Sequence, residues 1–378
     1  MLTNNIPSGW EVKKLGDVCH FYNGKAHENS IDENGKYILV NSKFVSTDGN
    51  IKKRTNECLF PLVSGDIAIV MSDIPNGKAI AKCFYIESNN KYTLNQRIGC
   101  LRAKKDLSKY LYNIIIRNKY FLKFDDGVNQ TNLKKDEILG CPILLPPLEE
   151  QEVIAGVLGD WDNTLELLDR QIELKQQQKK HLMQILLTGT VRLSTFTTPW
   201  YEIKLGDVFQ IKKGEQLSKI NMLEFGKYPI LNGGQDFSGY TDNYNTDKNT
   251  ITISEGGNSC GFVSYITSEF WCGGHCYTVD TKIDKLFSYQ ILKFNESNIM
   301  KLRVGSGLPN IQKSALEKFK FYIPTDINEQ NAIAEVLTAV DDEIALLKQK
   351  RELVAQQKKY LMQNLLTGQI RVPIKKDN

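Results

Sequence analysis

The chain has 378 residues, of which 41% are hydrophobic and 24% charged, a composition typical of a soluble globular protein. No run approaches the roughly 18 apolar residues that a membrane-spanning helix needs. The start of the chain, MLTNNIPSGW, lacks the basic and apolar regions of a secretory signal. We therefore expect a cytoplasmic protein of about two or three domains, with its eight cysteines as reduced thiols. The net charge of +4 excludes a strongly basic or acidic chain, but it conceals an uneven distribution.

The sequence contains an internal duplication, which must be found before any motif is interpreted. Residues 10–24, WEVKKLGDVCHFYNG, recur as residues 200–214, WYEIKLGDVFQIKKG, at an offset of 190. A stronger match joins residues 150–192 to residues 329–371 at an offset of 179, with 23 of 43 positions identical. The chain therefore consists of a globular segment and a second segment, each present twice, and the second globular segment is about 11 residues shorter.

The second segment of each repeat predicts a long helix. Apolar residues step by three and four over about four to five heptads, which is the pattern of a coiled coil. Prolines 146, 147 and 324 precede the helices, and each helix ends at Thr-Gly, where glycine suits a C-cap. The predicted apolar seam consists of Ile154, Leu158, Trp161, Leu165, Leu168, Leu182 and Leu186 in the first helix and Ile333, Leu337, Val340, Ile344, Leu347, Leu361 and Leu365 in the second.

The order of the segments favours an antiparallel pair, because one helix leads away from the first globular segment and the other leads back. A two-fold pairing predicts that residues whose numbers add to 519 lie opposite each other. Trp161 would then face Lys358, within reach of a cation–π contact.

The globular segments predict short strands separated by turns, together with some helix. Strands are expected at 37–40, 66–70, 250–254 and 260–266, and a helix at 107–118. The prediction is an α+β fold: two similar mixed α/β domains joined by two long antiparallel coiled-coil helices, with pseudo-two-fold symmetry. The predicted boundaries are 1–146 for the first domain, 147–189 for the first helix, 190–325 for the second domain, 326–371 for the second helix and 372–378 for a C-terminal tail.

Charge is segregated between these parts. Residues 1–146 carry a net charge of +6 and residues 190–325 a net charge of +2, whereas residues 147–189 carry −4 and the remainder is balanced. Globular domains with an excess of basic residues suit contact with nucleic-acid phosphates. Solvated surface lysines explain such an imbalance equally well.

No catalytic constellation is recognisable. The chain has no GxxxxGK[ST] phosphate loop and no GxGxxG after a strand. The segment LLPPLEE lacks the polar and aromatic residues that DNA amino-methyltransferases place around a flipped base. Glu173 and Lys175 resemble half of a nuclease site but lie within the coiled coil. We therefore predict no catalytic residues.

One cluster raises the question of a metal. Cys260, Cys272, His275 and Cys276 offer four soft ligands, but zinc sites usually show two tight ligand pairs. Apolar neighbours instead favour small buried thiols, and we predict no metal site.

These features together resemble the specificity (S) subunits of type I restriction–modification systems. The resemblance rests on the duplicated order of domain and helix, and on the W-x4-LGDV start of each domain. It rests also on PPLEEQEVIAGVLG (146–159) and IPTDINEQNAIAEVL (323–337), each followed by a helix ending in LLTG. Residues 231–265, followed by FWCGGHCYTV, are similar to one class of the family's target recognition domains.

The resemblance implies a non-catalytic subunit that binds double-stranded DNA. Its two target recognition domains would each read half of a bipartite target, and its helices would set the spacing and dock two methyltransferase subunits. Restriction subunits, which form an ATP-dependent nuclease, would complete the assembly; S-adenosylmethionine, ATP and magnesium would belong to the partners, with no cofactor in this chain and no membrane contact. Because the two domains differ in sequence, the target should be asymmetric and interrupted.

The base-reading residues do not follow from any motif. Loops that combine Asn, Gln, Arg or Lys with Gly can approach base edges and phosphates, although an ordinary polar turn is the alternative at each position. The candidates in the first domain are Lys43, Lys52, Lys53, Arg54, Asn76, Lys78, Asn95, Gln96, Arg97, Asn129, Gln130, Thr131 and Asn132. Those in the second domain are Lys212, Lys213, Asn232, Gln235, Tyr240, Asn258 and His275.

Other residues have structural or docking interpretations. Trp10 and Trp200 are expected to anchor the cores, and Asn132 and Asn310 to cap or turn before a helix. On the helices, the side chains outside the seam could face the methyltransferase subunits; they include Leu174, Met183, Met362, Gln177 and Gln356.

Two alternatives stay open. A self-contained nuclease or methyltransferase would modify or cleave DNA without partners. A coiled-coil scaffold without a DNA role would show no sequence preference in binding.

Overall fold

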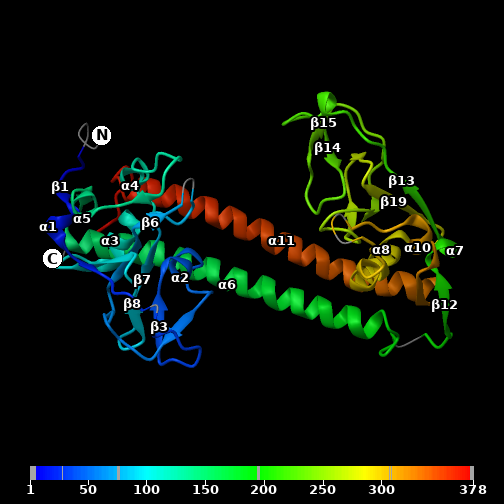
Figure 1. The fold of residues 1–378 in the computed structure, drawn as a ribbon, viewed down its shortest axis with the longest axis horizontal. Helices are drawn as coiled ribbons and strands as arrows, with labels where there is room; N and C mark the ends of the chain where they lie inside the picture. The colour runs from blue at the N-terminus through cyan, green and yellow to red at the C-terminus, as the bar shows by residue number, and fades with distance from the viewer. Residues whose placement is uncertain are drawn as a thin grey trace. The chain divides into compact units, whose positions relative to one another are not determined.

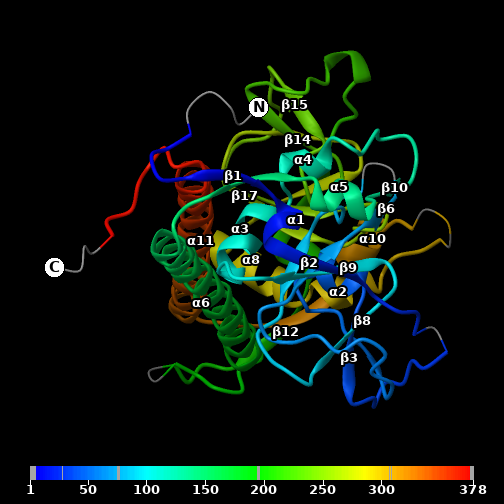
Figure 2. The same ribbon diagram turned by 90° about the vertical axis from the view of Figure 1, so that its left-hand side faces the viewer.

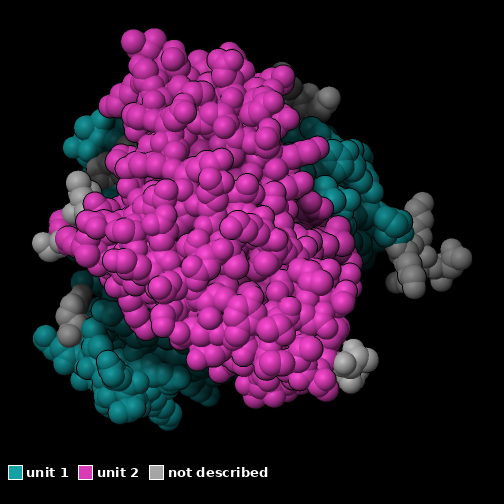
Figure 3. Space-filling view, turned by 90° about the vertical axis from the view of Figure 1, so that its right-hand side faces the viewer, with its two compact units in different colours: residues 1–167, 351–378 teal, residues 168–350 magenta. Residues whose placement is uncertain are grey.

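A computed structural model describes residues 6–27, 29–74, 77–193, 196–305, 307 and 309–374. The chain divides into two compact units (Figure 3): unit 1 comprises residues 1–167 and 351–378, and unit 2 comprises residues 168–350. The two long helices, α6 (Leu148–Leu186) and α11 (Ile327–Leu365), each contribute one end to each unit. Within the described ranges, no helix is both long enough and apolar enough to cross a membrane.

The globular part of unit 1 alternates short strands and helices (Figure 1). Its elements are β1 (Glu11–Lys14), α1 (Leu15–Val18), β2 (Cys19–Asn23), β3 (Tyr37–Val40), α2 (Ser42–Ser46), β4 (Lys53–Thr55), β5 (Ile67–Val70), β6 (Ser72–Asp73), β7 (Cys83–Tyr85), β8 (Tyr92–Leu94), β9 (Ile98–Ala103), α3 (Ser108–Ile115), α4 (Lys119–Leu122), β10 (Thr131–Asn132), α5 (Lys135–Leu139) and β11 (Pro142–Leu145).

The globular part of unit 2 repeats much of this order. Its elements are β12 (Trp200–Lys204), α7 (Leu205–Val208), β13 (Phe209–Lys213), a 3-10 helix η1 (Lys219–Asn221), β14 (Tyr228–Leu231), β15 (Gly239–Thr241), β16 (Thr250–Ser254), β17 (Val263–Ile266), β18 (Trp271–Cys272), β19 (Cys276–Thr281), α8 (Lys285–Phe294), α9 (Glu296–Met300), α10 (Lys313–Lys318) and β20 (Lys320–Pro324). The strands and the helix predicted from the sequence are therefore confirmed, with boundaries shifted by up to three residues.

Both units have the same sheet topology. Each has a four-stranded antiparallel sheet, in the order β2–β9–β5–β7 in unit 1 and β13–β19–β16–β17 in unit 2. Each also has a three-stranded sheet, β4–β3–β8 and β15–β14–β18, in which one of the two pairings is parallel. The α+β fold and the duplication inferred from sequence are thereby confirmed.

The register of the four-stranded sheets defines which residues are equivalent. Asn23 pairs with Gly99 in unit 1, and Lys213 pairs with Tyr277 in unit 2. Val70 pairs with Ile98, as Ser254 pairs with Cys276. One step beyond these strands, Met71 is therefore equivalent to Glu255, and Arg97 to His275. These equivalences allow the two units to be compared residue by residue.

The apolar faces of the sheets form the cores. In unit 1, Ile67, Ile69 and Leu101 pack with Tyr110 and Phe121. In unit 2, buried strands and helix α8 contribute the matching set, which includes Ile251, Ile253, Val279, Phe287 and Ile291. Trp10 lies in the first core and Trp200 packs against the second, as expected of core anchors.

The two long helices run antiparallel within each unit. In unit 1, Asp162 of α6 pairs with Lys358 of α11. In unit 2, Lys179 lies 2.7 Å from Asp341, and Lys175 lies 2.7 Å from Glu343. The residue numbers of these pairs add to 520, 520 and 518, which agrees with the predicted register. Asp162 with Lys358 and Asp341 with Lys179 are the same pair under the offset of 179, so the duplication preserves this contact.

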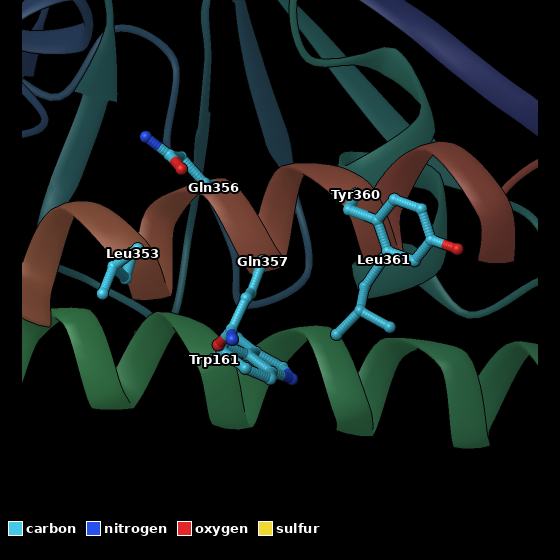
Figure 4. A pocket seen from close by; sticks show the side chains of 6 residues that line it. All are labelled: Trp161, Leu353, Gln356, Gln357, Tyr360 and Leu361. Carbon is cyan, nitrogen blue, oxygen red and sulfur yellow. The ribbon is translucent and has the colours of Figure 1, made fainter.

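All predicted seam residues are buried or half-buried. Trp161 does not make the contact expected of it: Lys358 pairs with Asp162, while Gln357 and Leu361 line the hollow beside Trp161 (Figure 4). The second helix also ends earlier than predicted, at Leu365 rather than residue 371. A left-handed backbone at Gly368, with φ +68°, turns the chain away from the helix axis.

The segment after each helix folds back onto a tryptophan at the start of a globular domain. In unit 1, the segment after α11, drawn in red, passes the blue segment that precedes β1 (Figure 2). The Arg371 guanidinium donates to both oxygens of Glu150, at 2.7 and 2.9 Å, and to the carbonyl of Ser8. In unit 2, Arg192 binds Glu329 and donates to the carbonyl of Thr198 at 2.9 Å. Both glutamates are fully buried, so each arginine neutralises a carboxylate that water does not reach.

Candidate nucleic-acid interface

Several candidate residues of unit 2 gather at one end of its four-stranded sheet. We call Lys213, Asn232, Glu255 and His275 the unit 2 edge. Lys213 ends β13, Asn232 follows β14, Glu255 follows β16 and His275 precedes β19. The Glu255 N–H donates to the His275 carbonyl at 2.9 Å, and the His275 N–H donates to the Asn232 side-chain oxygen at 3.3 Å. Four connections far apart in the sequence thus meet at one surface.

Charge at the unit 2 edge is mixed. Glu255 Oε1 accepts from Lys213 Nζ at 2.7 Å and from the Tyr277 hydroxyl at 2.9 Å. Burial, and then the hydrogen bond to Glu255, raise the pKa of Tyr277 well above its usual range, so its hydroxyl stays a donor. The Lys213 and His275 side chains are more than half exposed. Asn258 is exposed in the turn that follows Glu255.

The equivalent end of unit 1 gathers neutral polar residues and one arginine. We call Ser72, Arg97, Gln130 and Asn132 the unit 1 edge. Ser72 Oγ donates to the Asn132 side-chain oxygen at 2.7 Å, and Gln130 Nε2 donates to Ser72 Oγ at 2.8 Å. The Met71 N–H approaches the Arg97 carbonyl at 3.4 Å, in the position of the Glu255–His275 contact. Gln96 is exposed beside Arg97.

Of the two roles expected of Asn132, capping or a turn before a helix, the capping role is wrong, because Lys134 is the N-cap of α5. Asn132 lies in β10, which pairs with β6, and its equivalent Asn310 pairs with Gly256 and Val304. Both asparagines instead hold a loop against the end of the four-stranded sheet. Asn129, a further candidate, is exposed in a turn organised by Asp126, whose carboxylate accepts from the Asn129 and Val128 N–H groups. These hydrogen bonds lower the pKa of Asp126.

A close approach of two backbones fixes the start of each edge. A Cβ on Gly24 would collide with the Asn95 carbonyl, and a Cβ on Gly214 with the Gly273 carbonyl. Only glycine fits at these equivalent positions, which explains why the duplicated 15-residue segment ends in glycine in both copies.

Other candidates lie away from the two edges. Lys52, Lys53 and Arg54 are exposed on or next to β4, the edge strand of the three-stranded sheet of unit 1. Lys43 is exposed on α2 and Lys78 in the loop after β6. In unit 2, Gln235 lies in the turn between β14 and β15, and Tyr240 lies in β15, a strand of the three-stranded sheet. Lys212 alternates with Lys213 along β13 and therefore points to the opposite face. Asn76 lies outside the described residues.

Two candidates have side chains with buried polar atoms or little exposure. Thr131 is 6% exposed, and its hydroxyl donates to Asp125 at 3.0 Å, so it holds its own loop together. Asn95 is half-buried, and its side-chain oxygen is buried without a hydrogen-bond partner among the described residues.

The cysteine cluster consists of buried thiols. Cys260 donates to the Glu255 carbonyl at 3.0 Å, and Cys272 and Cys276 donate to backbone carbonyls at 3.7 Å. Burial raises the pKa of Cys260. In the part of the chain that the structure describes, no group of three or more His, Cys, Asp and Glu side chains could hold a metal ion.

Comparison with known families decides the affiliation. The model of the type I restriction modification DNA specificity domain matches residues 7–176 and 198–356, one match for each copy of the duplication. The chain belongs to this family.

Two of the similar named proteins align with nearly the whole chain, and a third aligns with less than half of it. A putative type I restriction enzyme MjaX specificity subunit from Methanocaldococcus jannaschii is 28% identical over 97% of this chain and 95% of its own. The MjaVIII specificity subunit of the same organism is 25% identical over 97% of this chain and 94% of its own. A putative type I specificity subunit from Mycoplasma pneumoniae is 36% identical over 44% of this chain and 45% of its own.

The fold also matches that of a solved specificity-family member. The type I restriction–modification S subunit from M. genitalium has a TM-score of 0.69 at 21% identity, over 97% of this chain and 98% of that chain. At this identity the match supports the shared fold rather than any shared target sequence.

Within this specificity-domain protein, sequence reasoning missed Ser72 and Glu255. Both closely follow a largely buried strand, β5 or β16. A signal was present for Ser72, which is the first polar residue after the wholly apolar strand β5. It was absent for Glu255, because β16 (TITIS) itself contains three polar residues. The search for Asn, Gln, Arg and Lys passed over them because it sought only basic and amide side chains.

Proposed function

We propose that the chain is the DNA-reading subunit of a type I restriction–modification complex, in which unit 1 and unit 2 each read one half of an asymmetric, interrupted target. The observation that carries this proposal is the pair of edges. The same backbone positions carry Asn23, Met71 and Arg97 in unit 1 but Lys213, Glu255 and His275 in unit 2. Because base edges are read by donor and acceptor pattern, different side chains at equivalent positions favour different half-sites.

The long helices would set the spacing between the half-sites, since each contributes to both units as one continuous element of 39 residues. A helix of this length spans about 58 Å at 1.5 Å per residue. The buried seam and the ion pairs between the helices hold each end of the pair in register.

The outer surfaces of the helices support docking of two copies of one partner. Each unit exposes side chains at equivalent positions under the offset of 179, with leucine at two of the three positions in both units: Leu167, Leu353 and Tyr360 in unit 1, and Leu346, Leu174 and His181 in unit 2. Leu167 is 71% exposed and its counterpart Leu346 is 64% exposed. Apolar residues repeated in an exposed row on a helix are typical of a protein interface. We call these six residues the docking positions.

In unit 1 the docking positions border a hollow. Trp161, Leu353, Gln356, Gln357, Tyr360 and Leu361 line an open space of about 490 Å³ (Figure 4). We propose that methyltransferase subunits cover these positions, and that they and the restriction subunits supply S-adenosylmethionine, ATP and magnesium chemistry. Met183, Met362 and Gln177 lie on the same helices, and their docking role stays a prediction.

Co-expression with candidate methyltransferase subunits, followed by mapping of methylated bases across a genome, tests the whole proposal. We expect one interrupted motif with two unlike halves. A continuous palindrome, or methylation by the purified chain alone with S-adenosylmethionine, would contradict it. Binding of DNA without sequence preference would favour the scaffold alternative.

A matched pair of variants tests docking separately. Leu174→Asp with Leu353→Asp places a charge at both equivalent positions, and we expect loss of the methyltransferase from the purified complex without loss of thermal stability. Glu352→Lys is the control, because this neighbouring helix residue is exposed but polar. Retention of the partner by the double variant would contradict the assignment.

A further inference from the structure

Glu255 is the residue that most distinguishes the unit 2 edge from the unit 1 edge. Its backbone makes the same contacts as that of its equivalent Met71. The Ile311 N–H donates to the Glu255 carbonyl at 2.8 Å, and the Leu133 N–H donates to the Met71 carbonyl at 2.8 Å. The carbonyl is thus held by the equivalent donor in both units, and the carboxylate distinguishes unit 2 at this position.

The groups that hold the carboxylate are also specific to unit 2. Lys213 and Tyr277 bind Oε1, whereas the equivalent residues of unit 1 are Asn23 and Gly99. Tyr277 is 3% exposed, and its hydroxyl also lies 3.1 Å from the Ile311 carbonyl. The acid and its two donors therefore occur together in one unit and are missing together from the other, as expected of a site built around one carboxylate.

The two carboxylate oxygens differ in their surroundings. Oε1 has two donors within 2.9 Å. Among the described residues, the ionisable side chain next to Oε2 is the His275 ring, whose Nδ1 lies 4.0 Å away, too far for a hydrogen bond. The side chain as a whole is 13% exposed. Oε2 therefore retains acceptor capacity beside the exposed His275, in an orientation that Tyr277 fixes.

DNA phosphates repel a carboxylate, so Glu255 can lie at a DNA-facing unit 2 edge only if other contacts offset this repulsion. Lys213 offsets the charge, and the fixed orientation lowers the entropy lost on binding. In the major groove, carboxylates accept hydrogen bonds from the amino group of cytosine, and adenine also presents an amino group there. Thymine O4 and guanine O6, which are acceptors, would repel Oε2.

We propose that Glu255 is a specificity-determining residue, and that its carboxylate accepts a hydrogen bond from an exocyclic amino group of one base in the half-site read by unit 2. This inference rests on the proposed function. It identifies the chemical group read, an amino donor carried by cytosine at N4 or by adenine at N6, and the experiment distinguishes these two sources.

The test uses the full chain in complex with its methyltransferase partner and Glu255→Gln as the variant. Because Lys213 and Tyr277 are both donors, the glutamine oxygen would turn toward them and its NH2 group toward the base. An acceptor thus becomes a donor. We expect the mapped motif to change at one position of one half, from an amino base to thymine or guanine or to no preference, while the other half is unchanged.

Binding to synthetic duplexes gives the magnitude. Replacing the single amino group read by Glu255 with hydrogen should weaken wild-type binding by about 5- to 150-fold, the usual range for a good base contact, and should leave binding by Glu255→Gln nearly unchanged. The base whose analogue has this effect, cytosine or adenine, identifies the source. Glu202→Gln is the matched control, because Glu202 is also ion-paired, with Lys320 at 2.6 Å, but lies on β12.

Two results would overturn the inference. One is an unchanged motif for a folded Glu255→Gln variant. The other needs only the wild-type chain and covers a variant that does not fold: no amino group in either half-site whose removal weakens binding. A wild-type complex without any bipartite motif would instead contradict the proposed function, so the two failures are distinguishable.

Discussion

In each unit an arginine, a glutamate and a tryptophan hold the segment that follows a long helix, but the hydrogen bonds among them differ between the units. In unit 1 the Trp10 indole donates to Glu150 at 2.9 Å, and Arg371 binds the same carboxylate. In unit 2 Arg192 binds Glu329, but the Trp200 indole N–H is buried without a partner in the part of the chain described. The contact from Arg192 to Thr198 spans 6 positions, whereas that from Arg371 to Ser8 spans 363.

A tandem duplication can therefore repeat a contact while changing how far apart in the sequence the two contacting segments lie. The segment after α6 contacts the start of the globular domain that directly follows it in the sequence. The segment after α11 instead contacts the start of the chain. The described residues after α11, which end at residue 374, therefore belong to unit 1, and Val372 packs against the unit 1 core. Four experiments test the difference between the two units.

Cross-linking gives the largest expected signal, because it is nearly all or none. Leu165→Cys with Val354→Cys in unit 1, and Lys175→Cys with Ile344→Cys in unit 2, are equivalent pairs under the repeat and obey the register of 519. We expect both to form disulfides on mild oxidation, seen as mobility shifts on non-reducing gels. Cross-linking of residue 165 to a cysteine one turn away, at 351 or 358, in preference to 354 would contradict the register.

Removing the arginines should have the next largest effect. Arg192→Ala leaves the buried Glu329 without a recorded donor, and we expect a loss of about 3–5 kcal/mol in the free energy of unfolding. Arg371→Ala should cost less, because Glu150 keeps the Trp10 hydrogen bond. Urea denaturation measures both, and Glu329→Gln added to Arg192→Ala should restore part of the loss. Arg170→Ala, which removes an exposed pair with Glu173, is the control; an equal loss there would refute the assignment.

The tryptophans isolate a single hydrogen bond. Trp10→Phe removes the donor to Glu150, whereas Trp200→Phe removes an N–H that has no partner among the residues that the structure describes. Because both changes remove a similar apolar area, we expect Trp10→Phe to cost about 1–2 kcal/mol more than Trp200→Phe. Chemical denaturation of the two variants in parallel provides the measurement, and equal costs would show that the hydrogen bond contributes little.

The ion pair between the helices that both copies of the duplication contain should give the smallest change in stability. Asp341 accepts from Lys179 and, at 2.8 Å, from Gln290, and its side chain is 35% exposed. Asp162 pairs with Lys358 and is 50% exposed. We expect Asp341→Asn to lower the free energy of unfolding by about 1 kcal/mol and Asp162→Asn by about 0–0.5 kcal/mol. Thermal melting at low and high salt checks the order, and a larger loss for Asp162→Asn would reverse the interpretation.

Much of the fold was accessible from the sequence, because it depends on periodicity. The seam residues, the strand at 250–254 and the helix pairing register all follow from apolar spacing. The details that failed depend on a single neighbour. Whether Lys358 meets Trp161 or Asp162 is decided by one step along the helix, and Asn132 bonds to Ser72, 60 positions away.

The candidate interface was accessible only in part. The pattern of glycine with amide or basic side chains selected Asn232, His275, Arg97 and Gln130 as candidates, and the structure places them at the ends of the four-stranded sheets. Composition could not separate them from Arg54 or Tyr240, which have the same chemistry but belong to the smaller sheets. Nor could composition identify Glu255, because its proposed role depends on its contacts with Lys213 and Tyr277.

By itself, the sequence determined the duplication, the long helices, the family and the expectation of two unlike reading domains, because repeats and heptads are properties of residue order. Only the tertiary structure decided which loops share an edge, that Met71 and Glu255 are equivalent, and that Arg371 closes unit 1. These depend on strand pairings and contacts between residues far apart in the chain, and no local pattern specifies a long-range partner.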